Sequence, residues 1–287
     1  MNNNTAENSS GAGIHARRAI AYIVLCILTF LCLFWFVILF VNATRSHSDL
    51  TRGFTLIPSV YLPKNWTGLM KGTLPVVNGL LNSFVVAACA AVLCTYFSTM
   101  TAYAIHAYDF KLKKFFFTFI LAIMMIPTQV TSLGFLRLIQ RMKLEDNLLP
   151  LILPAIAAPV TFFYMKQYMD STLSLSLIEA ARIDGAGEFR IFNTIVLPLM
   201  KPAIAVQAIF TFVSSWNNYF IPALILHKDK MKTLPVLIAQ LRSADFLKFD
   251  MGQVYMMIAF SIFPVIVVYL ILSRYIVAGV ALGGVKE

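Results

Sequence analysis

Charged side chains are scarce in this sequence of 287 residues: Asp, Glu, Lys and Arg together make up 13%, whereas hydrophobic residues make up 59%. A soluble globular domain carries about 25% charged residues, so this chain has too few to cover a water-exposed surface of its size. The composition therefore excludes a soluble enzyme, an intrinsically disordered protein and a disulfide-stapled secreted module. A membrane protein is the class that remains.

Residue groupings that would carry catalysis or bind a metal are also missing. All four cysteines lie in apolar runs without a CxxC pair, namely Cys26, Cys32, Cys89 and Cys94. The four histidines are scattered, and we expect them to be solvated loop residues: His15, His47, His106 and His227. No G-x-x-x-x-G-K-[ST] segment occurs, so a phosphate-binding loop for ATP hydrolysis is lacking. The sequence thus predicts no catalytic residue, no metal site and no cofactor.

Basic residues outnumber acidic ones by 23 to 13, which gives a formal net charge of +10. They stand in short groups between apolar runs, as in loops that face anionic lipid headgroups. No basic stripe alternates with aromatic residues, the pattern that would indicate nucleic-acid binding. The charge pattern predicts contact with membrane lipid and no contact with nucleic acid.

Six apolar runs are long enough to cross the hydrocarbon core of a bilayer, which takes about 20 helical residues. They lie at 19–41, 79–104, 115–139, 148–169, 201–226 and 254–277. The runs are continuously apolar, whereas the strands of a membrane barrel alternate over about 10 residues. The predicted fold is an all-α polytopic membrane protein with six transmembrane helices. The first run is too long for a signal peptide, so we expect it to be retained.

The predicted domain organisation is a single transmembrane domain over 19–277, between tails at 1–18 and 278–287. The polar composition of the first tail predicts disorder. An even number of spans places both tails on the same side of the membrane. The basic residues divide almost evenly between the two sides, so charge does not orient the chain.

The loop at 171–200 has the pattern of two short helices joined by a turn. Ser176 and Glu179 have the spacing of a capping box that opens a helix. Glycines at 185 and 187 break that helix, and a second amphipathic piece follows at 188–196. A docking element for another protein and an interfacial helix lying on headgroups both fit this pattern.

The same loop matches the EAA signature of ATP-binding-cassette (ABC) importer permeases. The matching residues are Glu179, Ala180, Ala181, Gly185, Ile195, Leu197 and Pro198. Further segments resemble maltose-type carbohydrate permeases, among them 188–192, 197–202 and 215–218. Over nearly its whole length the chain is similar to the shorter, six-span subunit of such a permease heterodimer.

This resemblance implies a set of partners and an orientation. An ATPase dimer on the cytoplasmic side would contact the EAA loop, a second homologous permease would complete the pore, and an extracytoplasmic solute-binding protein would deliver a carbohydrate. Both tails would then be cytoplasmic, in a multi-pass protein of the cell membrane. The resemblance gives Glu179 a contact with the ATPase, Gly185 the turn, and Ala180, Ala181 and Asp184 further contacts.

Polar residues within the spans are candidates for the substrate path. Amides and aromatic rings suit sugar hydroxyls and C–H faces, and the residues chosen on this ground are Asn82, Gln129, Trp216, Asn217 and Asn218. Hydrogen bonding between helices is the alternative role for any one of them. No Lys, Arg, Asp or Glu stands at mid-span, which disfavours amino acids, phosphate esters and metal ions as substrates.

An ion-gradient-driven secondary transporter is the alternative function. It predicts ionisable residues at mid-span and paired repeat halves, and neither is found in the sequence.

Overall fold

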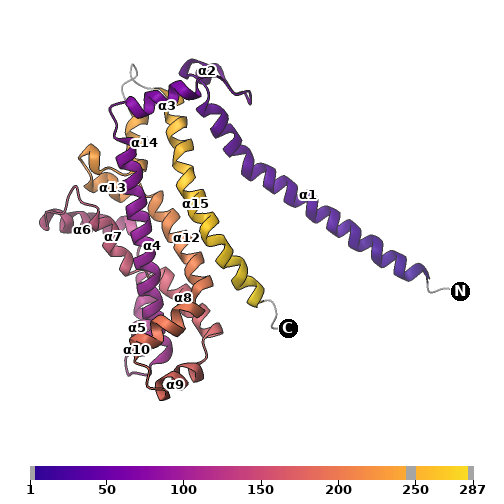
Figure 1. Ribbon diagram of the computed structural model, residues 1–287, viewed down its shortest axis with the longest axis vertical. Coiled ribbons are helices and arrows are strands. Elements are labelled where there is room, and N and C mark those ends of the chain that lie inside the picture. Colours follow the sequence, from indigo (N-terminus) through magenta and orange to yellow (C-terminus); the bar gives the residue numbers. More distant parts are fainter. Residues whose placement is uncertain (1–3, 244–249, 284–287) are drawn as a thin grey trace. The chain divides into compact units, whose positions relative to one another are not determined.

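The computed structural model describes residues 4–243 and 250–283, and within them every regular element is helical (Figure 1). This confirms the predicted all-α class. The chain divides into two compact units. The first unit comprises Met1–Lys71 and Asp245–Phe260, and the second comprises Gly72–Ala244 and Ser261–Glu287.

The first unit contains α1 (Asn4–Ala43), α2 (His47–Arg52), α3 (Leu62–Lys71) and the beginning of α15 (Met251–Gly283). The buried amide of Asn65 on α3 donates to the carbonyls of Ala43 and Arg45, both at 2.9 Å. A Cβ at Gly252 would lie 2.7 Å from the Arg45 carbonyl oxygen, so glycine permits the close approach of α15 here. These contacts join three distant segments at one end of the unit.

Helix α1 differs from the sequence expectation at its start. It begins at Asn4, so residues 4–18 are helical in the structure although their composition predicts a disordered tail. An apolar span already supplies the helical nucleus, so each further residue adds one backbone hydrogen bond as the helix continues.

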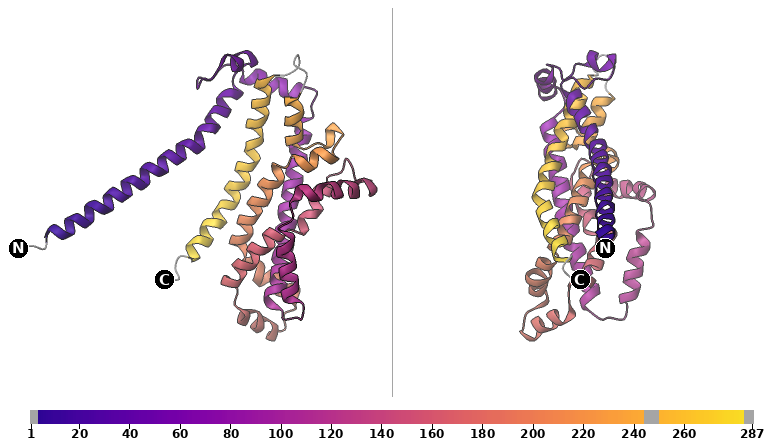
Figure 2. Two further views of the ribbon diagram at one scale, coloured as in Figure 1. Left: turned by 180° about the vertical axis from the view of Figure 1, so that it is seen from behind. Right: turned by 90° about the vertical axis from the view of Figure 1, so that its right-hand side faces the viewer.

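The second unit is organised around α4 (Val76–Ala107), with α12 (Lys201–Trp216) and α8 (Pro159–Thr172) packed along it. The side chains of α4 at these contacts are small and buried, including Ala87, Ala90 and Ala91. Small side chains let helix axes approach closely, as the alanine-rich run predicts. Figure 2 shows these helices side by side from two further directions.

Shorter helices surround this centre. They are α5 (Lys113–Ile123), α6 (Thr128–Arg141), α7 (Leu149–Ile152), η1 (Leu153–Ile156), α13 (Phe220–Ile225), η3 (Asp229–Met231) and α14 (Leu234–Arg242). A Cβ at Gly79 would lie 2.4 Å from Leu237, and the Ser83 hydroxyl accepts from the Leu234 amide at 2.8 Å. Helix α14 therefore packs tightly on the beginning of α4.

Four helices in the described residues are long and apolar enough to span a membrane: Arg17–Ala43, Val76–Ala107, Leu149–Thr172 and Met251–Tyr275. A fifth span results if Glu188–Leu199 and Lys201–Trp216, which meet at 80°, count as one. The count of six stays a prediction.

The run at 115–139 is not one continuous helix, because α5 ends at Ile123 and α6 begins at Thr128. Pro127 stands in extended conformation at this break, with φ −62° and ψ 132°. Proline lacks an amide donor and disfavours helical geometry in the residue before it. Figure 1 shows α6 running crosswise to α4 after the break.

Candidate functional site

The EAA loop lies at the end of the second unit where α4 and α8 terminate (Figure 2). Helix α9 (Leu175–Ile183) and helix α10 (Glu188–Ile191) form its two arms. Ser174, not Ser176, is the N-cap of α9, and its hydroxyl lies 2.7 Å from the Ser176 hydroxyl. The predicted capping box at Ser176 is therefore wrong. Leu173, just before the cap, is buried in the core, and this sets the point where the chain enters the helix.

The turn after α9 is a Schellman motif. The amide of Gly185 donates to the Arg182 carbonyl, and the amide of Ala186 donates to the Ala181 carbonyl, both at 3.0 Å. This pattern places Gly185 in the left-handed region, where its φ is +78°. No heavy atom lies within 4 Å of a Cβ at Gly185, so glycine is required by the backbone angle and not by crowding.

Most of the predicted contact residues face outward. Glu179, Ala180 and Asp184 are exposed, as is Gly185. Ala181 is only 9% exposed and packs in the hydrophobic core with Ile178, three residues earlier on the same helix face. The predicted contact role of Ala181 is therefore better explained as packing that holds α9 in place.

Two large apolar side chains extend from the loop into the surroundings. Ile183 is 86% exposed and Phe189 is 73% exposed, on either side of the turn. Neither was among the contact residues predicted from the signature, although the amphipathic pattern at 188–196 includes Phe189. Together with Glu179 and Asp184 they make an apolar and acidic surface, which we call the docking face.

A polar network behind the docking face joins its two arms to α4. The Arg182 guanidinium donates to the Glu188 carboxylate, with Nε and Oε1 2.7 Å apart. The Tyr103 hydroxyl on α4 donates to the other carboxylate oxygen at 2.8 Å. The hydrogen bond from Arg182 lowers the pKa of Glu188 to about 2, so the carboxylate is charged at neutral pH. A displacement of α9 or α10 is thus coupled to the end of α4.

Sequence reasoning missed this network. An arginine and a glutamate six positions apart on either side of a glycine turn are the local signal that could have indicated the ion pair. Tyr103 lies 85 positions from Glu188 and gives no such signal.

His106 at the end of α4 is not the solvated loop residue that the sequence predicts. Its side chain is 11% exposed, with Nδ1 2.8 Å from the Asp170 carboxylate. Its Nε2 lies 3.0 Å from the Leu173 carbonyl oxygen, which can only accept a hydrogen bond. His106 therefore fixes the entry of the chain into the EAA loop.

The core beneath the loop is apolar and continuous. Helices α9 and α10 and the π-helix η2 (Phe192–Val196) pack with the ends of α4 and α8. Ile178, Ile191 and Val196 are completely buried in it. Helix α11 (Leu197–Leu199) then leads into α12. The loop is thus packed against the helix bundle through this core.

The structure does not bring the five candidate path residues into one site. The Asn82 amide donates to the carbonyls of Lys230 and Lys232, at 2.9 and 3.1 Å, and so anchors η3 to α4. Trp216 is only 3% exposed and stacks on Phe212, with ring centroids 5.7 Å apart.

Asn217 and Asn218 follow α12 directly, and their backbone amides end that helix with bonds to Val213 and Ser215. The Asn217 side chain is exposed, and Gln129 is exposed on α6. The apolar cavity of this unit includes none of the five among its lining residues.

Comparison with known proteins shows the family of this chain. Residues 96–281 match the family model described as "Binding-protein-dependent transport system inner membrane component". The arabinooligosaccharides transport system permease protein AraQ of Bacillus subtilis (strain 168) is 35% identical over 265 residues, which cover 90% of this chain and 92% of that relative.

A second relative is the sn-glycerol-3-phosphate transport system permease protein UgpE of Yersinia pestis bv. Antiqua (strain Antiqua). It is 34% identical over 264 residues, which cover 90% of this chain and 94% of UgpE.

A solved structure shares the fold. It is a bacterial ABC transporter involved in the import of the acidic polysaccharide alginate, with a TM-score of 0.77 and 22% identity over 91% of this chain and 96% of that one. In such importers ATP is hydrolysed by subunits separate from the permease, and nothing favours the ion-gradient alternative. The chain therefore belongs to the family of binding-protein-dependent transport system inner membrane components, as a multi-pass permease subunit of an ABC importer.

Proposed function

We propose that this permease passes a neutral oligosaccharide through a pore that it shares with a second permease, and that its ATPase partner drives the pore through the docking face. The observation that carries the proposal is the exposed turn at Gly185, backed by the Arg182–Glu188–Tyr103 network. A loop that is joined to the bundle in this way transmits a movement of α9 and α10 to α4, as alternating access requires.

The docking face supports an ATPase contact by its chemistry. Exposed Glu179 and Asp184 offer carboxylates to a basic groove, and Ile183 and Phe189 offer apolar side chains to a hydrophobic one. An ATPase dimer that closes on ATP and opens after hydrolysis would move α9 and α10 with it.

The substrate class rests on the relatives and on the scarcity of fixed charge. AraQ is named for arabinooligosaccharides, a neutral class, and UgpE for a phosphate ester. The described spans of the second unit carry few ionisable side chains away from their ends, which suits a neutral solute. Asn217 and Asn218 are the amides we propose for contact with substrate hydroxyls, because they end α12 with the Asn217 side chain exposed.

Uptake into proteoliposomes tests the function. The complex of this chain with its ATPase, second permease and binding protein should accumulate an oligosaccharide from a panel that includes amino acids and sn-glycerol 3-phosphate. Accumulation of only an ionic solute would refute the carbohydrate substrate and leave the importer function intact.

A second permease chain is proposed from the surface of α1. Its segment Arg17–Ala43 is strongly apolar, and none of its most apolar stretch is buried by the other residues of its own unit. Trp35, at 70% exposed, is typical of the large side chains along it. A helix of this kind has a surface available for another membrane helix, and the homologous permease is the partner we propose.

We also propose that the EAA loop and both tails (1–18 and 278–287) are cytoplasmic, since the ATPase acts there. Asp184 and Asp229 are exposed residues on the EAA loop and on η3, which is anchored to the opposite end of α4. In a chain without its native cysteines, Asp184→Cys should react with an impermeant maleimide only in inverted vesicles. Asp229→Cys should react only in intact cells, and the reverse pattern would invert the topology.

A further inference from the structure

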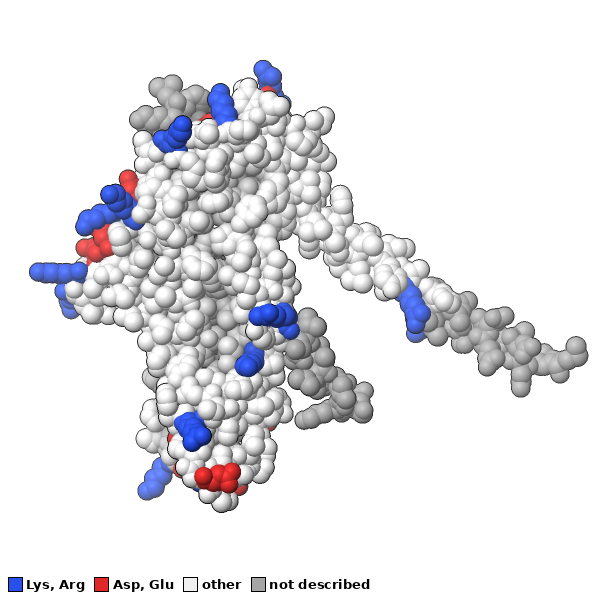
Figure 3. All heavy atoms as spheres, viewed as in Figure 1, with Lys and Arg blue, Asp and Glu red and all other residues white. Residues whose placement is uncertain are grey.

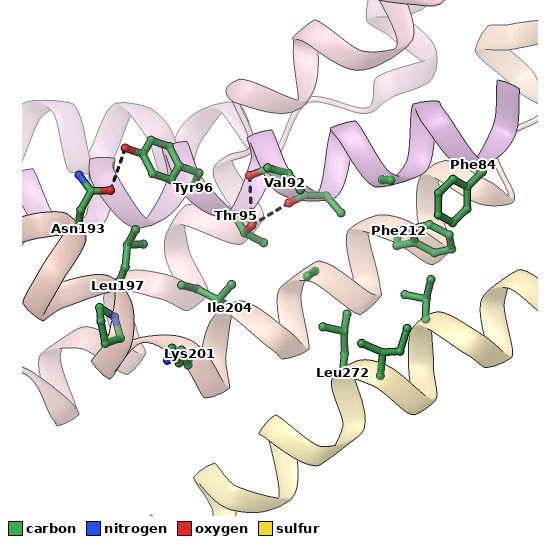
Figure 4. A pocket seen from close by; sticks show the side chains of 16 residues that line it. Phe84, Val92, Thr95, Tyr96, Asn193, Leu197, Lys201, Ile204, Phe212 and Leu272 are labelled. Atoms are coloured by element: carbon green, nitrogen blue, oxygen red, sulfur yellow. Dashed lines mark hydrogen bonds between the residues drawn. The ribbon is translucent and has the colours of Figure 1, made fainter. Parts of the chain in front are cut away.

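An elongated apolar cavity of about 610 Å³ lies within the second unit, between α4, α12 and the later part of α15. Figure 4 shows it with Phe84 and Phe212 at one end and Lys201 toward the other. The Phe84 and Phe212 rings meet edge to face, with centroids 6.0 Å apart, and close the first end. Its size falls in the range of about 300–1,000 Å³ that is typical of small-molecule pockets.

Apart from Lys201, the polar side chains that line the cavity already have hydrogen-bond partners within the chain. The Tyr96 hydroxyl donates to Asn193 Oδ1 at 3.3 Å (Figure 4), and the Asn193 amide donates to the Phe189 carbonyl at 2.8 Å. The Thr95 hydroxyl donates to the Ala91 carbonyl at 2.8 Å. The cavity wall therefore presents almost only carbon, and an apolar ligand is the kind that fits it.

One exposed cation lines the cavity, and a second follows a lining residue on α15. Lys201 lines the cavity at the start of α12 and is exposed. Arg274 is exposed on α15, one helical turn beyond the lining residue Ile271 and on the same helix face. Its guanidinium lies over the Tyr275 ring, 4.8 Å from the centroid.

These cations lack acidic partners in the described part of the chain, where no ion pair involves Lys201 or Arg274. The sequences of α4, α12 and α15 contain no Asp or Glu. Figure 3 shows basic side chains near the lower part of α15 and uncharged surface above them on the same face of the unit. An anion would therefore complement the charge at this end of the cavity.

The length of the cavity matches one leaflet. It runs along α4 from Phe84 to Tyr96, which is about 18 Å at the rise of an α-helix. Half of a hydrocarbon core is about 15 Å. The charged end lies toward the EAA loop, since Asn193 and Lys201 follow α10 in the chain.

We propose that this cavity binds one acyl chain of an anionic phospholipid from the leaflet on the side of the EAA loop, with the phosphate held by Lys201 and Arg274. In this position the lipid contacts α4, α12 and α15. A helix of another chain would fill the apolar part but would leave both cations without an anion.

Photolabelling of the full complex in membranes tests the site. The probe is phosphatidylglycerol with a photoreactive group in its acyl chain, and we expect it to label cavity residues such as Val92 and Ile204. Unlabelled phosphatidylglycerol should compete, and phosphatidylcholine should not. Lys201→Gln and Arg274→Gln should each lower labelling by about fivefold, whereas Lys111→Gln with Lys114→Gln, exposed cations outside the cavity, should not.

A matched pair of substitutions tests the apolar part of the cavity. Ala88 lines the cavity, and Val85, one turn earlier on α4, is exposed and does not. Ala88→Phe should abolish labelling, whereas Val85→Phe should retain it. The proposal would be overturned if phosphatidylcholine labelled the cavity equally well, or if neither charge substitution changed the labelling. It would also be overturned if the isolated chain were labelled and the assembled complex were not, because another chain would then cover the cavity.

Discussion

At the scale of single residues, Gly185 and Gly187 are alike in having open space at the Cβ position and differ in backbone angle. Both are exposed, and neither has a heavy atom within 4 Å of a Cβ position. Only Gly185 has a positive φ, at +78°, whereas Gly187 has φ −71° in extended conformation. An L-residue in the left-handed region costs about 1–2 kcal/mol, so the same substitution should have different effects at the two sites.

We expect Gly185→Val to reduce uptake strongly and Gly187→Val to leave it near the wild-type rate, when the amounts of chain in the membrane are matched. Gly185→Asn should be intermediate, because asparagine tolerates positive φ better than a β-branched residue does. Equal loss of uptake in the two valine variants would show that the turn is sensitive to bulk and not to backbone angle.

Reversing the charge of Glu179 tests the proposed contact of the docking face with the ATPase. The residue is exposed, so Glu179→Lys leaves the packing of α9 on the core unchanged. Reversing the charge opposite a basic groove costs several kcal/mol, and we expect uptake and co-purification of the ATPase to fall by about tenfold or more. Exposed Thr172, before α9, offers a control, since Thr172→Lys should have little effect. Wild-type uptake by Glu179→Lys would remove this residue from the contact.

At the scale of helices, one hydrogen bond from a buried tyrosine links the ion pair of the EAA loop to α4, beside the apolar core that the loop shares with that helix. Tyr103→Phe keeps the ring, which is 4% exposed, and removes the bond to Glu188. The lost bond to a charged acceptor is worth about 1.5 kcal/mol. We expect ATP hydrolysis to continue while uptake per ATP falls, because the ATPase still docks but α4 follows it less closely.

The ratio of solute imported to ATP hydrolysed measures this coupling. Tyr164→Phe is the control, because Tyr164 is an exposed tyrosine on α8 that lies outside this network. An unchanged ratio in Tyr103→Phe would mean that the network only holds the loop together.

The Arg182–Glu188 pair also predicts a pH dependence. The hydrogen bond from Arg182 lowers the pKa of Glu188 from 4.5 to about 2. The pair therefore stabilises the folded chain fully above about pH 4.5, and this contribution is lost as the pH falls toward 2. In detergent, the difference in thermal midpoint between wild type and Glu188→Gln should be constant near neutral pH and shrink across this window. A difference that persists at pH 2 would contradict it.

At the scale of the whole molecule, the chain is one subunit of an ABC importer. It contains no phosphate-binding loop, so the purified chain alone should show neither ATP hydrolysis nor uptake. An ATP-binding subunit and a second permease should co-purify with it from detergent. Measurable ATP turnover by a preparation of this chain alone would contradict the prediction.

The sequence by itself determined what depends on local forces. In lipid each segment must satisfy its own backbone hydrogen bonds, so apolar runs become helices whatever their neighbours are. The glycine turn was equally local, because the left-handed angle at Gly185 follows from residue type and helix termination. The EAA signature identified the family for the same reason, as its residues lie within one short loop.

Only the tertiary structure decided which neighbours these residues have. Ala180 and Ala181 are neighbouring alanines, yet Ala180 is exposed and Ala181 is buried against the core. Asn82 holds η3 and His106 holds the chain at Leu173, because the backbone carbonyls of these segments lie beside their side chains. Tyr103 meets Glu188 across 85 positions. Burial and partner choice are properties of packed helices, and they are set by which faces meet, a choice that no single segment contains.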